Sequence, residues 1–317
     1  MLSLTCACAC GAVVADAPSK RALRFRASTP QEAREWQREA REKLFALLMG
    51  GRQPAKVPLD PQVISRVEPK FPSYVLTEFS FQSLPGRRVH GWMATPTKPK
   101  GKVGGVLAIH GHGGPGKRVV EGDNGYWYGR HLAEMGYVVV APDIGKHDPP
   151  HDNWTMMGEW VWDCLCAVDY LAGQPEVDPK RLAVIGISLG GELTMYTAAL
   201  DERLKLADSS GWLCTVENMK LGHCNCWTYP GLEESFDYPD IFACIAPRYL
   251  ICENGEQEPE RGGFPVATAK KAFAEIREAY KVFGAPDRLQ HDIHPGGHIP
   301  GGKLFFPWCY KVLGEPK

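Results

Sequence analysis

The chain has 317 residues, of which 44% are hydrophobic and 23% charged, and its formal net charge is −1. A nearly neutral chain produces no electric field that would attract a polyanion, which argues against nucleic acid as a partner. No apolar run reaches the roughly 18 to 20 residues that a helix needs to cross a bilayer, so no membrane partner is expected either.

The first 27 residues are expected to be a leader or a disordered extension. The opening MLSLTCACACGAVVADAPSK is weakly apolar and ends in a small-residue pattern typical of a signal peptide, but it lacks a basic start. Whether residues 1–17 are cleaved stays open. The alternating Cys6, Cys8 and Cys10 have no partner cluster nearby, so they do not predict a metal site. Eleven cysteines without regular spacing favour free thiols and a cytoplasmic location, with export as the alternative.

Residues 28–317 are expected to form a single domain that begins with a helix over about residues 28–50. Within STPQEAREWQREAREKLFALLMGG, Thr29 is the expected N-cap, Pro30 the first helical residue, and Glu32 the partner that completes a capping box. The pair Gly50-Gly51 marks the end of the helix. A proline-rich linker is expected over about residues 52–72.

The remaining chain alternates predicted strands with predicted helices. The runs SYVLTEFSFQS and RRVHGWMATPT, separated by Leu84-Pro85-Gly86, predict a β-hairpin. Helical patterns, the clearest over residues 266–283, separate the later apolar runs, which are GGVLAIH, GYVVVAPD, RLAVIGIS, RLKLADSS, PRYLICEN and RLQHDIH. This alternation predicts an α/β fold with a mostly parallel sheet, an antiparallel start, and helices on both faces.

A glycine-rich motif follows the first of these apolar runs. In AIHGHGGPG, Gly111, Gly113 and Gly116 have the spacing G-x-G-x-x-G that binds dinucleotides. That function needs a helix that starts inside the glycines, so that its N-terminus faces the pyrophosphate. The following GPGKRVVEGDNGYWYGR contains Pro115, Gly116, Gly122, Asn124 and Gly125, so no prompt helix start and no nucleotide cofactor are expected.

A second glycine motif carries the predicted nucleophile. Gly186-Ile187-Ser188-Leu189-Gly190 has the pattern G-x-S-x-G and lies between a predicted strand and a predicted helix, as a nucleophile elbow requires. The glycines are needed because the turn is sharp and brings backbones close together. Ser188 is therefore the expected nucleophile.

An acyl-transfer site also needs two backbone N–H groups directed at the developing oxyanion. We assign one to Leu189, which follows the nucleophile, and the other to His112 in the earlier HGHGG loop. The imidazole of His112 is expected to be incidental.

The general base should be a late histidine, because the chain order in this architecture is serine, acid, histidine. The stretch LQHDIHPGGHIPGG offers three candidates. His291 and His294 fall within or at the end of the last predicted strand. His298 follows two glycines in a loop that can reach the serine, so His298 is preferred and His294 comes next.

Five segments together resemble a known group of proteins. IHGHGG, GISLGGE, HCNCWTYPGL, IAPRYL and HPGGH, in this order, are similar to the α/β-hydrolase superfamily and to its dienelactone-hydrolase and acetyl-xylan-esterase-like branch. The resemblance runs from about residue 30 to the C-terminus. It implies a serine esterase in which Ser188 attacks an ester carbonyl and His298 transfers the proton.

The chain departs from this group where the acid of the triad is expected. The family has a Gly-x-x-Asp-Pro turn after the APRPL-like strand, whereas this chain reads GEQEPERGGFPV. Alignment from the left places Glu258 at the acid position, and alignment from the right places Arg261 there. Glu258 is the expected acid. The fallbacks are Glu256 and Glu260 in the same loop and Asp208, which is expected after an earlier strand, while Glu253 is expected at its strand end.

Two clusters have residue types that could bind metal. His147, Asp148, His151 and Asp152 lie in a proline-interrupted loop that cannot present two histidines on one helix face. The segment LGHCNCWTYPGL suggests zinc or a disulfide through His223, Cys224 and Cys226, but two cysteines one residue apart bridge badly. Neither metal nor another cofactor is expected.

The same segment is expected to pack over the cleft, and either Trp227 or Tyr229 then lines the acyl or sugar site. Core packing is the alternative for both residues. The same two interpretations apply to Trp154, Trp160 and Trp162, which could serve as a carbohydrate platform.

The sequence as a whole therefore predicts a serine carboxylic ester hydrolase for a small ester, such as an acetyl group on a carbohydrate. The alternatives are a serine peptidase on the same fold and a non-catalytic binding protein that has lost the triad acid. The acyl group, the alcohol and the oligomeric state stay open.

Overall fold

The computed structural model describes residues 21–67, 73–97, 99, 101–122, 125–148, 150–151 and 153–316. Most of the expected leader, including its three cysteines, lies outside the described residues. Residues 21–27, however, belong to the domain. The amides of Ala22 and Leu23 donate to the carbonyls of Glu234 and Ser235, and Arg21 forms an ion pair with Glu275 at 2.8 Å. The boundary of the extension therefore lies before these residues.

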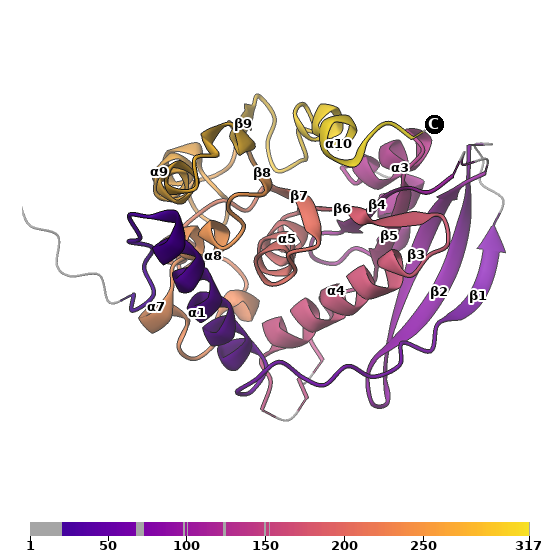
Figure 1. Ribbon diagram of the computed structural model, residues 1–317, viewed down its shortest axis with the longest axis horizontal. Coiled ribbons are helices and arrows are strands. Elements are labelled where there is room, and N and C mark those ends of the chain that lie inside the picture. The colour runs from indigo at the N-terminus through magenta and orange to yellow at the C-terminus, as the bar shows by residue number, and fades with distance from the viewer. Residues whose placement is uncertain are drawn as a thin grey trace, which may run out of the picture.

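The described strands form one nine-stranded sheet in the order β1-β2-β3-β5-β4-β6-β7-β8-β9 (Figure 1). The pairs β1–β2, β2–β3 and β3–β5 are antiparallel, and the remaining pairs are parallel. The strands are β1 (Gln62–Val67), β2 (Tyr74–Leu84), β3 (Arg87–Pro96), β4 (Val103–Ile109), β5 (Val138–Pro142), β6 (Val177–Ile187), β7 (Leu204–Ser210), β8 (Tyr249–Gly255) and β9 (Leu289–His294).

Helices cover both faces of this sheet (Figure 1). One hydrophobic cluster joins the sheet to α2, α3 and α10, and a larger one joins it to α1, α4, α5, α8 and α9. The helices are α1 (Pro30–Leu48), α2 (Gly116–Glu121), α3 (Trp127–Glu134), α4 (Met156–Ala172), α5 (Leu189–Leu200), α6 (Val216–Met219), α7 (Leu232–Ser235), α8 (Tyr238–Ala243), α9 (Val266–Val282) and α10 (Phe305–Leu313), with the short 3₁₀ helices η1 (Asn225–Trp227) and η2 (Pro286–Arg288).

The burial of the central strands explains why their sequences are continuous apolar runs. Every residue of β4 is buried, because helices pack on both faces of a parallel sheet.

The capping box expected for α1 is present, since the side chain of Thr29 accepts from the Glu32 amide and Glu32 accepts from the Thr29 amide. No described helix has the length and apolar character that spanning a membrane would require.

The expected linker over residues 52–72 contains a strand. β1 pairs antiparallel with β2 at the edge of the sheet. Its apolar residues Val63, Ile64 and Val67 are exposed. A strand is normally predicted from the alternation of apolar and polar residues, which depends on one buried face. This edge strand exposes its apolar residues, so only the proline-rich composition of its flank was noticed in the sequence.

A helix also starts where none was expected, since α2 begins at Gly116 directly after the HGHGG loop. The Gly116 amide donates to Oδ1 of Asp143 at 2.6 Å, so a carboxylate from the end of β5 caps this helix. The helix ends after six residues at Gly122, which has left-handed backbone angles. Asp143 therefore already occupies the helix N-terminus where a pyrophosphate anion would bind.

Candidate active site

Ser188 lies at the sharp turn between β6 and α5. Its φ of 59° and ψ of −123° form a combination that non-glycine residues rarely adopt. A Cβ on Gly186 would lie 2.3 Å from the carbonyl oxygen of Gly190, and a Cβ on Gly190 would lie 2.3 Å from that of Ile109. The glycines of the G-x-S-x-G motif thus permit backbone contacts that any side chain would prevent.

The loop after β4 passes close to this serine. A Cβ on Gly111 would approach the Ser188 Cβ to 3.3 Å. Leu189 is the first residue of α5, so its amide has no acceptor within the helix. Ser188, Leu189 and His112 line one cavity of about 200 Å³. The two residues expected to form the oxyanion hole are therefore neighbours of the expected nucleophile.

His110 was not singled out from the sequence, although it positions this loop. Its buried ring accepts from the Ile144 amide at Nε2 (3.1 Å), and Nδ1 donates to the Gly111 carbonyl at 2.7 Å. Burial lowers the pKa of His110, which favours the neutral ring that can both donate and accept. His110 therefore joins the loop after β4 to the loop after β5.

The structure brings His298 and Glu258 together. Nδ1 of His298 lies 2.7 Å from Oε1 of Glu258, whose side chain is only 2% exposed. The second carboxylate oxygen of Glu258 accepts from the Phe264 amide at 3.3 Å, and the Phe264 ring stacks on the imidazole with 5.5 Å between centroids. His298 and Ser188 line the same cavity. His298 thus has a carboxylate at Nδ1 and shares the cavity with Ser188.

Two sets of contacts hold the loop that carries His298. Before it, the amides of Glu256 and Gln257 donate to the carbonyls of His294 and Gly296. After it, Glu253 accepts from the amides of Gly301 and Gly302 at 2.9 and 2.6 Å. From the sequence, Glu253 was expected only at its strand end, because its contacts are with a loop about fifty residues away.

The other fallback residues lie elsewhere. Asp208 lies within β7 rather than after it and is fully buried, and burial raises its pKa well above the usual range. Glu256 and Glu260 are exposed. His291 contacts the Asn254 side chain through Nε2 at 3.0 Å, and Nδ1 of His294 accepts from the Gly296 amide.

Comparison with known proteins agrees with this architecture. Residues 89–209 match the Dienelactone hydrolase family. "Putative hydrolase YtaP" of Bacillus subtilis (strain 168) is 29% identical over 290 residues, which cover 82% of this chain and 93% of that protein. A Bacteroides fragilis NCTC 9343 structure titled "putative acetyl xylan esterase (BF1801)" has a TM-score of 0.73, with 20% identity over 93% of this chain and 92% of that chain.

A glucuronoyl esterase from Solibacter usitatus has a TM-score of 0.67 with 14% identity, over 88% of this chain and 91% of that chain. This chain is an α/β-hydrolase-fold protein. The expected fold class and the expected resemblance to dienelactone hydrolases are confirmed. The family match also supports the expected enzyme class, a hydrolase of carboxylic esters.

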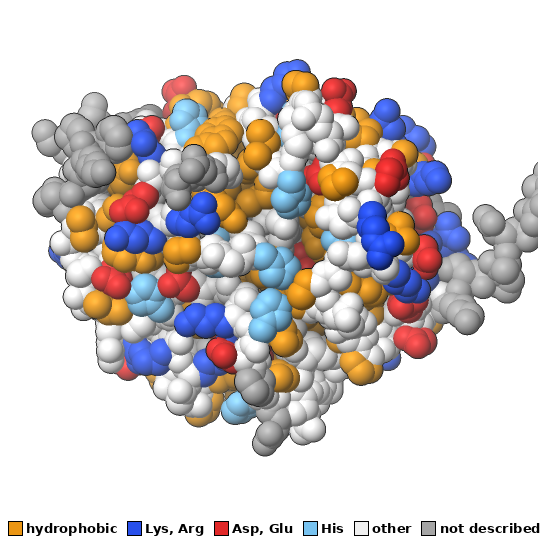
Figure 2. Space-filling model, turned by 180° about the vertical axis from the view of Figure 1, so that it is seen from behind, with side chains coloured by type: hydrophobic (Ala, Val, Ile, Leu, Met, Phe, Trp, Pro, Cys, Tyr) orange, Lys and Arg blue, Asp and Glu red, His pale blue; other side chains and the backbone are white. Residues whose placement is uncertain are grey.

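Ser188 and His298 line two adjoining hollows of this α/β-hydrolase fold. The smaller is the cavity of about 200 Å³, whose walls include the buried residues Glu192, Trp212 and Trp227. The larger, of about 580 Å³, is lined by residues that include Gly111, Tyr126 and Ile299. On one face of the molecule, several histidine side chains gather near the centre (Figure 2). The two expected catalytic residues thus lie between the smaller cavity and the larger hollow.

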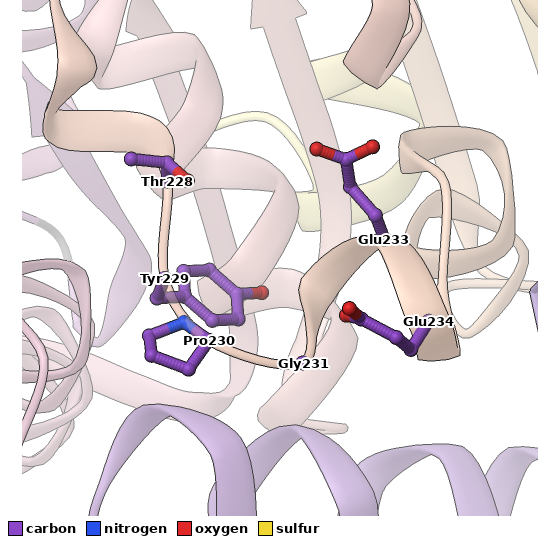
Figure 3. Close-up of a pocket in the computed structure, with 6 residues that line it drawn as sticks. All are labelled: Thr228, Tyr229, Pro230, Gly231, Glu233 and Glu234. Atoms are coloured by element: carbon purple, nitrogen blue, oxygen red, sulfur yellow. The ribbon is translucent and has the colours of Figure 1, made fainter.

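The two aromatic candidates of the LGHCNCWTYPGL segment, Trp227 and Tyr229, line different hollows. Trp227 lines the smaller cavity beside Ser188. Tyr229 instead lines a different hollow of about 520 Å³, with Thr228, Pro230, Gly231, Glu233 and Glu234 (Figure 3). Its hydroxyl lies 2.9 Å from that of Tyr196 in the core. Tyr229 is therefore outside the residues that line the smaller cavity, and its expected substrate contact stays a prediction.

The tryptophans considered as a carbohydrate platform pack inside the protein. Trp160 and Trp162 are each only 1% exposed. Their indole N–H groups donate to the carbonyls of Lys146 and Ser83. Trp154 stacks edge-on against Trp162. Core packing is therefore the interpretation that fits Trp160 and Trp162.

The histidine and cysteine residues that could bind metal form a different group in the structure from the two clusters seen in the sequence. Nε2 of His112 lies 3.1 Å from Sγ of Cys226, and Nε2 of His147 lies 3.5 Å from Sγ of Cys224. His223 instead contacts the Gly263 carbonyl. The imidazole of His112 is thus part of a cluster with His147, Cys224 and Cys226. The grouping was missed because its members come from three separate loops.

Proposed function

We propose that this protein is a serine carboxylic ester hydrolase with Ser188 as nucleophile, His298 as general base and Glu258 as the orienting acid. The contact of 2.7 Å between His298 and Glu258, beside a serine at a strained elbow, carries the proposal. A carboxylate at Nδ1 fixes the tautomer in which Nε2 is free to accept the serine proton.

The reaction then proceeds in two steps. Ser188 Oγ attacks the ester carbonyl while His298 takes its proton, and the amides of Leu189 and His112 donate to the oxyanion. Collapse of the tetrahedral intermediate breaks the ester bond, and His298 returns the proton to the leaving alcohol. Water, deprotonated by His298, releases the acid from the acyl-enzyme and restores the serine.

The two hollows support a small acyl group and a larger alcohol. The cavity of about 200 Å³ is the smaller of the two and has the buried residues Glu192, Trp212 and Trp227 in its wall, which favours a small acyl group such as acetyl. The hollow of about 580 Å³ has room for a sugar, and Tyr126 offers an aromatic surface there. Two structural neighbours, one titled "putative acetyl xylan esterase (BF1801)" and one titled as a glucuronoyl esterase, also support esters of carbohydrates.

Replacement of Ser188 tests the proposal. The Ser188→Ala variant should lose turnover of p-nitrophenyl acetate by at least about 10³-fold. A fluorophosphonate probe should label the parent protein at Ser188 and leave the variant unlabelled. Unchanged turnover in the variant would contradict the proposal. Faster cleavage of peptide amides than of esters would instead favour a peptidase. No contact among the described residues of the site favours a binding protein without an acid.

A further inference from the structure

Four potential metal ligands from three loops converge beside the proposed active site. His112 lies in the loop after β4, His147 in the loop after β5, and Cys224 and Cys226 lie at η1. Their ligand atoms, two imidazole nitrogens and two sulfurs, all lie within 4.8 Å of one another. The two rings stack nearly parallel, with 5.8 Å between centroids.

The spacing of these atoms matches tetrahedral zinc coordination. Zinc bonds of about 2.3 Å to sulfur and about 2.1 Å to nitrogen place tetrahedral ligand atoms roughly 3.3 to 3.8 Å apart. The measured nitrogen-to-sulfur distances are 3.1 Å for His112–Cys226 and 3.5 Å for His147–Cys224. Small rotations of the side chains would therefore admit the ion.

The ligand types also select the metal. Two thiolates and two imidazoles form the Cys₂His₂ set that is typical of structural zinc, and they disfavour the hard cations Mg²⁺ and Ca²⁺. Two thiolates also neutralise the charge of a divalent ion. Cys224, His112 and His147 are exposed, so burial in an apolar core does not account for their convergence.

We propose that His112, His147, Cys224 and Cys226 bind one Zn²⁺ ion, which ties three loops together at the wall of the smaller cavity. All four positions of the tetrahedron are filled by protein atoms, so the ion is structural rather than a Lewis acid for substrate. Glu192, whose buried Oε1 has no hydrogen-bond partner among the described residues, lines the same cavity.

The site has a consequence for catalysis that rests on the proposed function. His112 would offer its ring to the metal and its amide to the oxyanion, so fixing the ring also fixes the donor. The segment with Cys224 and Cys226 continues into Trp227, which lines the same cavity as Ser188. Loss of the metal should therefore lower kcat through a misplaced oxyanion donor, even though no ligand atom contacts the reacting carbonyl.

Metal content of the full-length protein, prepared without a histidine tag, provides the first test. The parent should contain about one zinc ion per chain, and His147→Ala and Cys224→Ser should each contain less than about a tenth of that. His151→Ala is the matched control, because this exposed histidine lies on the same loop but outside the cluster. Two results would overturn the proposal. One is a parent protein that contains no zinc after addition of Zn²⁺, and the other is a His147→Ala variant with the same zinc content as the parent.

Cobalt substitution and chelation provide readouts independent of activity. Co²⁺ in the parent should give the intense visible absorption of a tetrahedral thiolate site, and Cys224→Ser should not. Chelation should lower the Tm of the parent and of His151→Ala, and leave that of Cys224→Ser unchanged. The Ser188→Ala variant should keep its zinc, so a failure of the esterase proposal is distinguishable from a failure of the metal site.

Discussion

Nδ1 of His298 lies 2.7 Å from Oε1 of Glu258, although 40 positions separate the two residues along the chain. The contact forms because the loops after the neighbouring strands β8 and β9 bond to each other. The Gln257 amide donates to the Gly296 carbonyl, and the Gln257 side chain donates to the Pro295 carbonyl at 2.8 Å. The glutamate that the sequence analysis preferred as the acid is thus placed beside the preferred histidine.

Neutralising each candidate acid separately should identify the one that orients His298. Glu258→Gln keeps the shape of the side chain but removes the charge and the fixed tautomer, so kcat should fall by about 10³- to 10⁴-fold. Glu256→Gln and Asp208→Asn, which alter two of the three fallback acids, should each stay within about threefold of the parent. The measurement is steady-state hydrolysis of p-nitrophenyl acetate. A loss confined to Asp208→Asn would assign the triad acid to β7 instead.

Gly186→Ala should destabilise the elbow itself. The added methyl would lie 2.3 Å from the Gly190 carbonyl oxygen, a backbone atom that cannot move aside as the end of a flexible side chain can. The free energy of unfolding should fall by about 2 to 4 kcal/mol, as the urea midpoint will report. Gly173→Ala is the control, because Gly173 has a φ of −82° and its nearest atom would lie 3.4 Å away. Equal losses in both variants would contradict the close contact.

The stability contribution of Asp208 should depend on pH. Burial raises the pKa of Asp208 well above 3.8, and the charges of Glu253 and Asp292 raise it further. The folded protein therefore binds this proton more tightly than the unfolded chain does, so stability decreases as the pH rises from about 4 toward the folded pKa. The amide side chain of the Asp208→Asn variant does not ionise. The Tm of this variant relative to the parent should rise between about pH 5 and pH 8, and a falling difference would contradict the shift.

Enlarging the smaller cavity should change the acyl preference. Met219 is buried and lines this cavity, so Met219→Ala should raise the ratio of kcat/KM for p-nitrophenyl butyrate over acetate by about fivefold or more. Met195→Ala is the control, since Met195 is fully buried in α5, outside the residues that line the cavity. Both changes should cost about 2 to 4 kcal/mol of stability, but the control should leave the ratio unchanged. A shift in both variants would mean that the cavity does not hold the acyl group.

The local signals in the sequence predicted most of the fold. The hairpin β2–β3, the buried parallel strands and the caps of α1 were readable because hydrophobic periodicity and capping chemistry act over a few residues. β1 was missed because an exposed edge strand has no buried face to pattern its residues. The start of α2 was missed because Asp143, from another strand, caps it.

The sequence by itself determined where the serine elbow lies, since G-x-S-x-G between a strand and a helix is a local motif with a local steric reason. Only the tertiary structure brought Glu258 beside His298, and only it gathered His112, His147, Cys224 and Cys226. These relationships depend on how the loops at one edge of the sheet pack together. The distances between these loops cannot be inferred from spacing along the chain, because each loop is positioned by the strand that precedes it and by the loops it contacts.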